Sequence, residues 1–326
     1  MKKKISGIFL YWLIFVLFPP SESFSWGFFA HKRINRMAVF TLPPAMIGFY
    51  KKHIDYLTEH ATDPDRRRFS DPHEAARHFL DSDRYGLHPF DSIPHRWKDA
   101  VAKYGEDSLL LHGIVPWYIE RMVYRLSEAF KEKNTDLILH YSSDLGHYVA
   151  DAHVPLHTTR NYNGQLSNQK GIHAFWESRI PELKSETYGF FAGRAVYIAN
   201  PLEAAWEAVK QSYAAKDSVL GFEATLNARF APDLKYSMEN RGAQVVRMYS
   251  EAYTNAYNEM LGNMVERRML ESIRLLGSLW YTAWVNAGQP DLRQIEYKEI
   301  SDSLIHIGRI NDELWKKMKQ DELHGN

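Results

Sequence analysis

The amino-acid sequence predicts an all-α fold, organised as a single multi-helix domain. Apolar residues recur every three or four positions through most of the chain, which is the period of an amphipathic helix. No segment shows a convincing apolar–polar alternation of the kind found in a half-buried strand, and there is no internal repeat or clear linker. The chain has 326 residues and no cysteine, so its core must be stable without disulfides.

The first two predicted helices lie close together in the sequence. Residues 28–42 carry apolar positions at helical spacing, and the pattern stops at Pro43 and Pro44. Residues 45–60 repeat the pattern. Residues 62–73 are rich in aspartate, proline and charged residues, so we expect a loop there.

The rest of the chain is also largely helical in its pattern. Pro155 limits the helix that precedes it, and the polar residues 158–171 are expected to form a loop. Residues 185–235 contain several glycines and prolines and are the expected position of an insertion. Further helices are predicted at residues 107–131, 135–153, 202–215 and 240–287.

The N-terminus has the features of a signal peptide over residues 1–25. Three lysines precede a 14-residue apolar run, and small residues at positions 23 and 25 suit cleavage after Ser25. A membrane-spanning helix needs about 20 apolar residues, so we expect no stable membrane anchor. The sequence therefore predicts an exported protein, periplasmic or secreted, whose mature chain begins at Trp26.

The mature chain is expected to contain one domain over residues 26–290 and a C-terminal helical tail over residues 291–326. Without residues 1–25 the chain has 37 basic and 39 acidic residues, a formal net charge of −2. This balance gives no bulk electrostatic argument for binding duplex nucleic acid, although a local basic groove remains compatible with it. The sequence leaves the oligomeric state unknown.

The strongest signal for chemistry lies between His147 and Glu177. Asp151 follows His147 by four residues, so both side chains lie on one helix face, and His157 comes six residues later. His173 and Glu177 form a second pair at the same four-residue spacing. Imidazoles and carboxylates without thiolates are typical of zinc in a catalytic site.

Chance explains some of these spacings in a chain with 15 histidines. His140 and Asp144 form another such pair seven residues upstream, but no histidine follows Asp144 after six residues. A lone pair of this type is more often a surface hydrogen bond. His153 faces a different side of the helix from His147 and is interpreted as structural or as a support to the ligands.

Together these motifs resemble the superfamily of zinc-dependent phospholipases C and single-strand-specific nucleases, over residues 26–180. The resemblance implies an all-α fold with three zinc ions at the bottom of a cleft. It implies that one ion is bound by the amine and carbonyl of Trp26 and by His31. A second is bound by Asp63, His78, His147 and Asp151, with Asp151 bridging these two ions, and a third, more exposed ion by His157, His173 and Glu177.

One ligand has an alternative. The carboxylate partner of His78 is expected 14 or 15 residues upstream; Asp63 is 15 away and Asp65 is 13. We choose Asp63, because Arg66 follows it as an arginine does in the nuclease branch, and keep Asp65 as the alternative. Trp26 without the downstream motifs would be interpreted as a core aromatic residue.

The resemblance also implies a mechanism. Asp63 would orient a zinc-bound hydroxide or take its proton, and Arg66 would neutralise a phosphoryl oxygen. Arg66 is equally compatible with a solvated position in the basic run 66–68. The loop at residues 161–170 would border the cleft, with Asn163 and Asn168 as candidate substrate contacts, although loop polarity explains these two asparagines as well.

The predicted substrate is a phosphate diester, in single-stranded nucleic acid or in a phospholipid. The gap from Trp26 to His31 and the His-x-Pro-Leu-His sequence ending at His157 are similar to the nuclease branch. Glu177 is similar to the phospholipase branch, and the short loop before His173 lacks the glycines usual in the nucleases. The alternative from another class is a non-catalytic, zinc-stabilised binding protein of the cell envelope.

Overall fold

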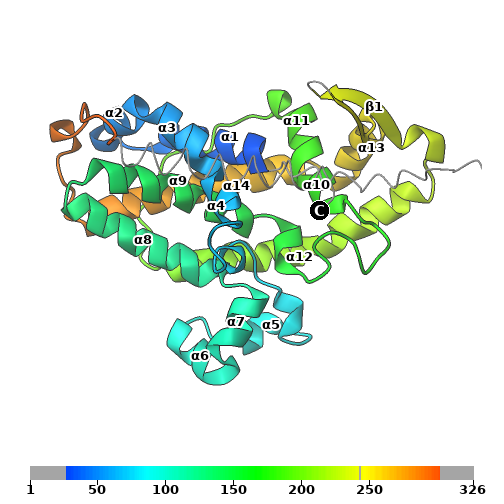
Figure 1. Cartoon of the computed structure of the whole chain (residues 1–326), viewed down its shortest axis with the longest axis horizontal. Helices are drawn as coiled ribbons and strands as arrows, with labels where there is room; N and C mark the ends of the chain where they lie inside the picture. Colours follow the sequence, from blue (N-terminus) through cyan, green and yellow to red (C-terminus); the bar gives the residue numbers. More distant parts are fainter. Residues whose placement is uncertain (1–26, 242–243, 302–326) are drawn as a thin grey trace, which may run out of the picture.

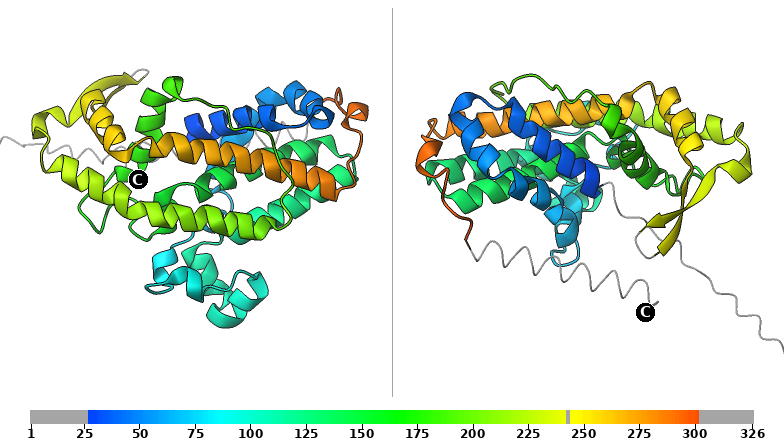
Figure 2. Two further views of the ribbon diagram at one scale, coloured as in Figure 1. Left: turned by 180° about the vertical axis from the view of Figure 1, so that it is seen from behind. Right: turned by 90° about the horizontal axis from the view of Figure 1, so that it is seen from above.

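Four long helices run along the long axis of the molecule (Figure 1). The computed structural model describes residues 27–241 and 244–301. Within them, α8 packs against each of the other three long helices, and α9 also packs against α14. Figure 2 shows the same lengthwise arrangement from behind and from above. The four long helices are α8 (Val115–Lys131), α9 (Thr135–Ala152), α12 (Pro201–Asn227) and α14 (Met264–Asn286).

Shorter helices surround this frame. Helix α1 packs against α3, α9 and α14, while α5, α6 and α7 project together from one side of the long helices (Figure 1). The shorter helices are α1 (Lys32–Ala38), α2 (Pro44–Lys52), α3 (Ile54–Glu59), α4 (Asp63–Arg67), α5 (Pro89–Ser92), α6 (Trp97–Tyr104), α7 (Glu106–His112), α10 (Ile172–Ala174), α11 (Ile180–Lys184) and α13 (Glu251–Leu261).

Capping residues set where three of the helices begin. The side chains of Asn134, Asn200 and Ser250 each accept a backbone N–H in the first turn of α9, α12 and α13. Such a cap satisfies a donor that has no partner inside the helix. Helix α13 ends at Gly262, which adopts the left-handed conformation that glycine tolerates best.

The core joins α9 to α2 and α14 at Ser142. Trp280 of α14 is fully buried and donates its indole N–H to the Ser142 carbonyl, at 3.1 Å. The Tyr50 hydroxyl of α2 lies 2.9 Å from Ser142 Oγ, and its ring lies against Trp280. Helix α9 is thus held by polar contacts as well as by apolar packing.

The all-α prediction is confirmed, with three local differences. Residues 240–241 and 244–249 are not helical: β1 (Tyr236–Arg241) and β2 (Gln244–Tyr249) form an antiparallel hairpin, the one sheet in the described part of the chain. The sequence Val245-Val246-Arg247-Met248-Tyr249 suits a strand better than a helix, because β-branched and aromatic residues predominate. Helix α12 also continues twelve residues past the predicted end at 215.

The third difference bears on the site. Residues 63–67, expected in a loop, form helix α4. Pro64 stands in the first turn, where its missing N–H costs nothing, and the carboxylates of Asp63 and Asp65 favour the positive end of the helix. The proline and aspartates that indicated a loop are therefore the start of a helix.

The predicted segment boundaries are only partly covered by the described residues. The predicted signal peptide, Trp26 and most of the predicted tail helix lie outside them. Within residues 291–301, the Glu296 carbonyl lies 3.1 Å from His53 Nε2, and the Ser301 N–H donates to Asp136. The boundaries at residues 25 and 290 stay predictions. No helix in residues 27–241 or 244–301 has the length and apolar character needed to cross a bilayer.

Close packing of α1 on α9 gives a test of the fold. A Cβ at Gly146 would stand 1.8 Å from Asn35 Oδ1, and the Asn35 amide is fixed by the carbonyls of Leu57 and Ser143. We expect Gly146→Ala to lower the free energy of unfolding by about 1–3 kcal/mol, because the two helices must separate. Urea unfolding of the metal-free protein measures this.

Gly221→Ala is the matched control. Gly221 lies in α12, and a Cβ there meets no other atom within 4 Å. We expect its free energy of unfolding to stay the same or to rise by up to about 1 kcal/mol. Equal stability of the two variants would contradict the close approach of α1 and α9.

Candidate metal centre

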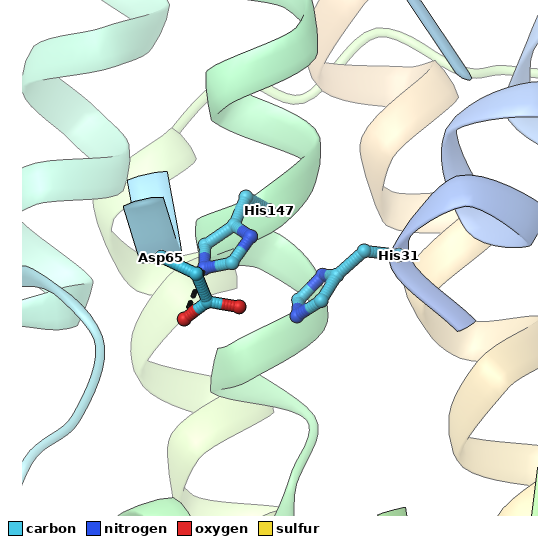
Figure 3. Close-up of side chains that lie close together, drawn as sticks. All are labelled: His31, Asp65 and His147. Atoms are coloured by element: carbon cyan, nitrogen blue, oxygen red, sulfur yellow. Dashed lines mark ion pairs between the residues drawn. The ribbon is translucent and has the colours of Figure 1, made fainter. Parts of the chain in front are cut away.

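Three groups of side chains bring potential metal-ligand atoms together. In each group the ligand atoms lie within 4.8 Å of one another. Figure 3 shows the first group, with His31 reaching α9 from the end of a π-helical turn, η1 (Gly27–His31), and Asp65 reaching it from α4. The groups are His31, Asp65 and His147; His78, His147 and Asp151; and His157, His173 and Glu177.

Asp151 connects these groups. Its Oδ2 atom lies 2.9 Å from His78 Nδ1 and 3.3 Å from His147 Nε2. Its Oδ1 atom lies 3.4 Å from His31 Nε2 and 3.5 Å from His157 Nδ1. Asp151 and His147 are one turn apart on α9, as the four-residue spacing predicts. One buried carboxylate therefore contacts four imidazoles.

Backbone carbonyls orient two of the rings. His147 Nδ1 lies 2.9 Å from the Ala61 carbonyl, and His157 Nδ1 lies 2.8 Å from the His78 carbonyl. A carbonyl only accepts, so each Nδ1 carries the proton and, in the neutral ring, Nε2 is the bare nitrogen. Both Nε2 atoms face the groups described above, which is how a metal-binding histidine is oriented. The residues present therefore fit a divalent cation.

The third group is closer to the surface than the other two. His157 Nε2 lies 3.0 Å from His173 Nε2, and Glu177 Oε2 lies 3.4 Å and 2.8 Å from these two nitrogens. His173 belongs to α10 and Glu177 to a π-helical turn, η7 (Phe175–Arg179). Such wide turns are frequent at functional sites. Two nitrogens that converge with a carboxylate suit a cation better than a hydrogen bond between rings.

The electrostatics of the site favour positive charge. Burial lowers the pKa of His147, but Asp151 and Asp65 outweigh it and raise the pKa to about 9. The pKa of His157 is likewise raised to about 9 against burial, by Asp151 and Glu177. The histidines in turn hold the pKa of Glu177 down at about 2, despite its burial. The carboxylates thus stabilise protons that a metal ion can replace.

Asp65, rather than Asp63, lies against the ligand groups. Asp65 Oδ1 is 3.8 Å from His147 Nε2 (Figure 3) and 3.9 Å from His78 Nδ1. Asp63 instead accepts hydrogen bonds from His60, at 2.7 Å, and from Arg66, at 3.1 Å. Residues two apart on a helix point in different directions, so α4 can aim only one of them at α9. We therefore prefer the alternative that the sequence left open.

Other predicted residues lie around the groups. Arg66 follows Asp65 directly, is mostly buried, and its guanidinium lies 5.0 Å from the centre of the Phe28 ring. Asn163 accepts the Gly171 N–H through its side chain, and Asn168 is exposed and takes a left-handed conformation. Both asparagines therefore have a role in the loop itself, and substrate contact by them stays a prediction.

Two histidines that the sequence set apart lie outside the three groups. His153 is buried and bonds the Val149 carbonyl one turn earlier. His140 lies 3.6 Å from Asp144, whose carboxylate is bound by Arg67. Among the described residues, neither His153 nor His140 belongs to a group of potential metal ligands.

Sequence reasoning missed Tyr162 and Glu74. Tyr162 is half-exposed and its ring meets the His173 ring edge-on, with 5.9 Å between centres. Its position in the loop between His157 and His173 was the available signal. Glu74 precedes His78 by four residues, the same spacing that identified His147 with Asp151, and it lies against His78.

Comparison with known protein families gives a match. The family model of zinc dependent phospholipase C matches residues 30–240, which is well over half of the chain. The matched region contains every residue of the three groups. No curated protein matches the chain.

The two aspartates of α4 give a matched test of the site. We expect Asp65→Asn to lower zinc affinity by at least about 10-fold, because a carboxylate that faces His78 and His147 is lost. Asp63→Asn should keep the full zinc content, since Asp63 contacts His60 and Arg66 instead. Zinc per chain after dialysis against a weak chelator measures both. Zinc loss in Asp63→Asn alone would reverse the assignment.

Proposed function

This chain belongs to the zinc-dependent phospholipase C family, and we propose that it hydrolyses phosphate diesters with three bound zinc ions. The observation that carries the proposal is the convergence of three ligand groups on one buried carboxylate, Asp151, with imidazoles oriented by backbone carbonyls. A protein that needed zinc only for stability requires one closed site of four ligands. Three adjoining groups, one of them near the surface, suit catalysis better.

The proposed ligands come from the three groups, with Asp65 and His147 of the first group assigned to the second ion and His31 paired with Asp151, which it contacts at 3.4 Å. His31 and Asp151 would hold the first ion together with the amine and carbonyl of Trp26. Asp151 would bridge the first ion to the second. The second ion would be held by Asp65, His78, His147 and Asp151, and the third by His157, His173 and Glu177.

Zinc in such a site lowers the pKa of bound water and offsets negative charge on the phosphoryl group. The side chains of the chain then have separate tasks. The Asp65 side chain is 28 % exposed whereas the Asp151 side chain is 3 % exposed, so Asp65 is the carboxylate that an attacking water would reach and that would take its proton. Asp63 holds the Arg66 guanidinium beside this position, where it can bind a phosphoryl oxygen.

We propose phospholipids as the substrate class. Two observations support this: the matching family is described as a phospholipase C, and Glu177 stands where the phospholipase branch has glutamate. Single-stranded nucleic acid is the second candidate. The half-exposed ring of Tyr162 beside His173 favours it, because bases stack on such rings.

Hydrolysis by the zinc-loaded chain that begins at Trp26 tests the function. We expect phosphate-ester release from phosphatidylcholine to exceed nucleotide release from single-stranded DNA or RNA. His147→Ala should lower the rate by more than about 100-fold, because it removes a ligand shared by two groups. Faster release from nucleic acid would assign the nuclease activity instead. No release above the His147→Ala rate from either substrate would favour the binding protein of the cell envelope.

Export is proposed together with this function. Cleavage after Ser25 would give Trp26 a free α-amine, which chelates a metal together with its own carbonyl oxygen. Trp26 directly precedes η1, and His31 at the end of η1 contacts Asp151. Cleavage would therefore complete the first zinc site as well as release the protein.

Two forms of the protein with different N-termini test this proposal. We expect the chain that begins at Trp26 to bind one zinc more than a chain that keeps Ser25 before it, because an acylated nitrogen is no longer a ligand. Metal analysis gives the zinc count, and mass spectrometry of the exported protein gives the cleavage site. Equal zinc counts in the two forms would remove Trp26 from the site.

A further inference from the structure

A buried cluster of charged residues lies behind His78. Glu74 is fully buried and carries a carboxylate that accepts hydrogen bonds from the Tyr148 hydroxyl, from Arg67 Nε at 3.4 Å and from Arg77. Its other neighbour is His78, whose Nε2 atom lies 3.5 Å from Glu74 Oε1. None of these contacts belongs to the three ligand groups.

His78 is oriented differently from the other histidines. His147 and His157 present Nε2 to the ligand groups and direct Nδ1 to a backbone carbonyl. His78 presents Nδ1, which lies 2.9 Å from Asp151 Oδ2, and its buried Nε2 faces Glu74. If Nδ1 is the bare nitrogen, Nε2 carries the proton, and the Glu74 carboxylate, at 3.5 Å, is an acceptor that faces this proton.

We propose that Glu74 is a positioning residue that fixes His78 with its proton on Nε2 and Nδ1 free for metal. The proposal rests on the proposed zinc site but not on the identity of the substrate. A carboxylate behind the ring sets the tautomer, the orientation and the basicity of a histidine ligand. A backbone carbonyl also sets the tautomer and the orientation. A carboxylate raises the basicity of the ring more strongly than a carbonyl does, because the carboxylate is charged.

The surrounding residues make this arrangement rigid. A buried carboxylate is costly unless it is paired and hydrogen-bonded, and two arginines and a tyrosine hydroxyl satisfy Glu74. Tyr148 also places its ring edge-on to both His78 and His147, at 5.6 Å between centres. Arg67 binds Asp144 of α9 as well, so Glu74 is tied to the helix that carries Asp151.

Four substitutions separate this role from general support of the fold. Glu74→Gln keeps the size of the side chain and removes its charge, and Glu74→Ala removes the acceptor. Asp71→Asn is the control: Asp71 also binds Arg77, at 2.9 Å, yet makes no contact with His78 among the described residues. Tyr148→Phe removes the hydroxyl that holds Glu74 and keeps the ring.

Zinc affinity of the full mature chain, measured by competition with a chelator, is the first measurement. We expect the zinc ion that His78 binds to lose about 10-fold in affinity in Glu74→Gln and about 100-fold in Glu74→Ala. Tyr148→Phe should lose less than Glu74→Gln, and Asp71→Asn should match the unmodified chain. Unchanged affinity in Glu74→Ala, or an equal loss in Asp71→Asn, would overturn the proposal.

The proton on His78 gives a second measurement that is independent of hydrolysis. In the zinc-loaded protein labelled with ¹⁵N-histidine, we expect the His78 ring proton on Nε2 and shifted downfield by the carboxylate. In Glu74→Gln it should move upfield, and in Asp71→Asn it should stay in place. A His78 proton on Nδ1 would overturn the proposal, even if either Glu74 variant fails to fold. A chain that binds zinc as expected but hydrolyses no diester would refute the proposed function alone.

Discussion

The buried charge of Asp151 is the constraint on which the site depends. The residue is buried, and its two oxygens contact four histidine rings. A carboxylate removed from water is unfavourable unless positive charge compensates it. Protons on His147 and His157 provide that charge when no metal is bound, which is why the pKa of each is raised to about 9. Divalent cations provide it better, because several ligand atoms share each ion.

Helix α9 is held at both ends of the segment that carries the ligands. Before His147, Gly146 allows Asn35 to lie directly against the backbone, and Ser142 binds both α2 and α14. After Asp151, the Ala152 carbonyl accepts from Ser212 at 2.7 Å, and the His153 carbonyl accepts from Arg268 at 3.0 Å. These bonds satisfy carbonyls that the end of a helix leaves without partners. The scaffold therefore fixes Asp151 by contacts from α1, α12 and α14.

The sequence allowed prediction of the site where local spacing determines geometry. His147 with Asp151, and His173 with Glu177, are one turn apart, so periodicity alone places each pair on one face. From the sequence we chose Asp63 as the ligand of α4, whereas the structure places Asp65 against the ligand groups. The choice depends on which way this five-residue helix faces. That orientation is set by contacts of α4 with α9, which spacing along the chain does not contain.

The fold shows the same division. Long periodic segments such as α8 and α9 were predicted within one or two residues, except where Gly113 separates α7 from α8. The β1–β2 hairpin was missed because its apolar residues adjoin a strongly helical segment. Its position depends on tertiary contacts: Tyr249 stacks on Phe175, with 3.9 Å between ring centres, and Arg179 binds Glu239. The hairpin thus supports the turn that carries Glu177.

His78 shows that the three ligand groups are not independent. Its Nδ1 atom belongs to the second group, while its backbone carbonyl orients His157 of the third. Its Nε2 atom faces Glu74, whose partners are Arg67 of α4 and Tyr148 of α9. A shift of this one residue would move ligands in two groups at once. His78 follows a short 3₁₀ turn, η4 (Ala75–Arg77), and is not part of a long helix. The local secondary structure therefore does not fix its position. The buried carboxylate behind it supplies the restraint that a long helix gives to His147.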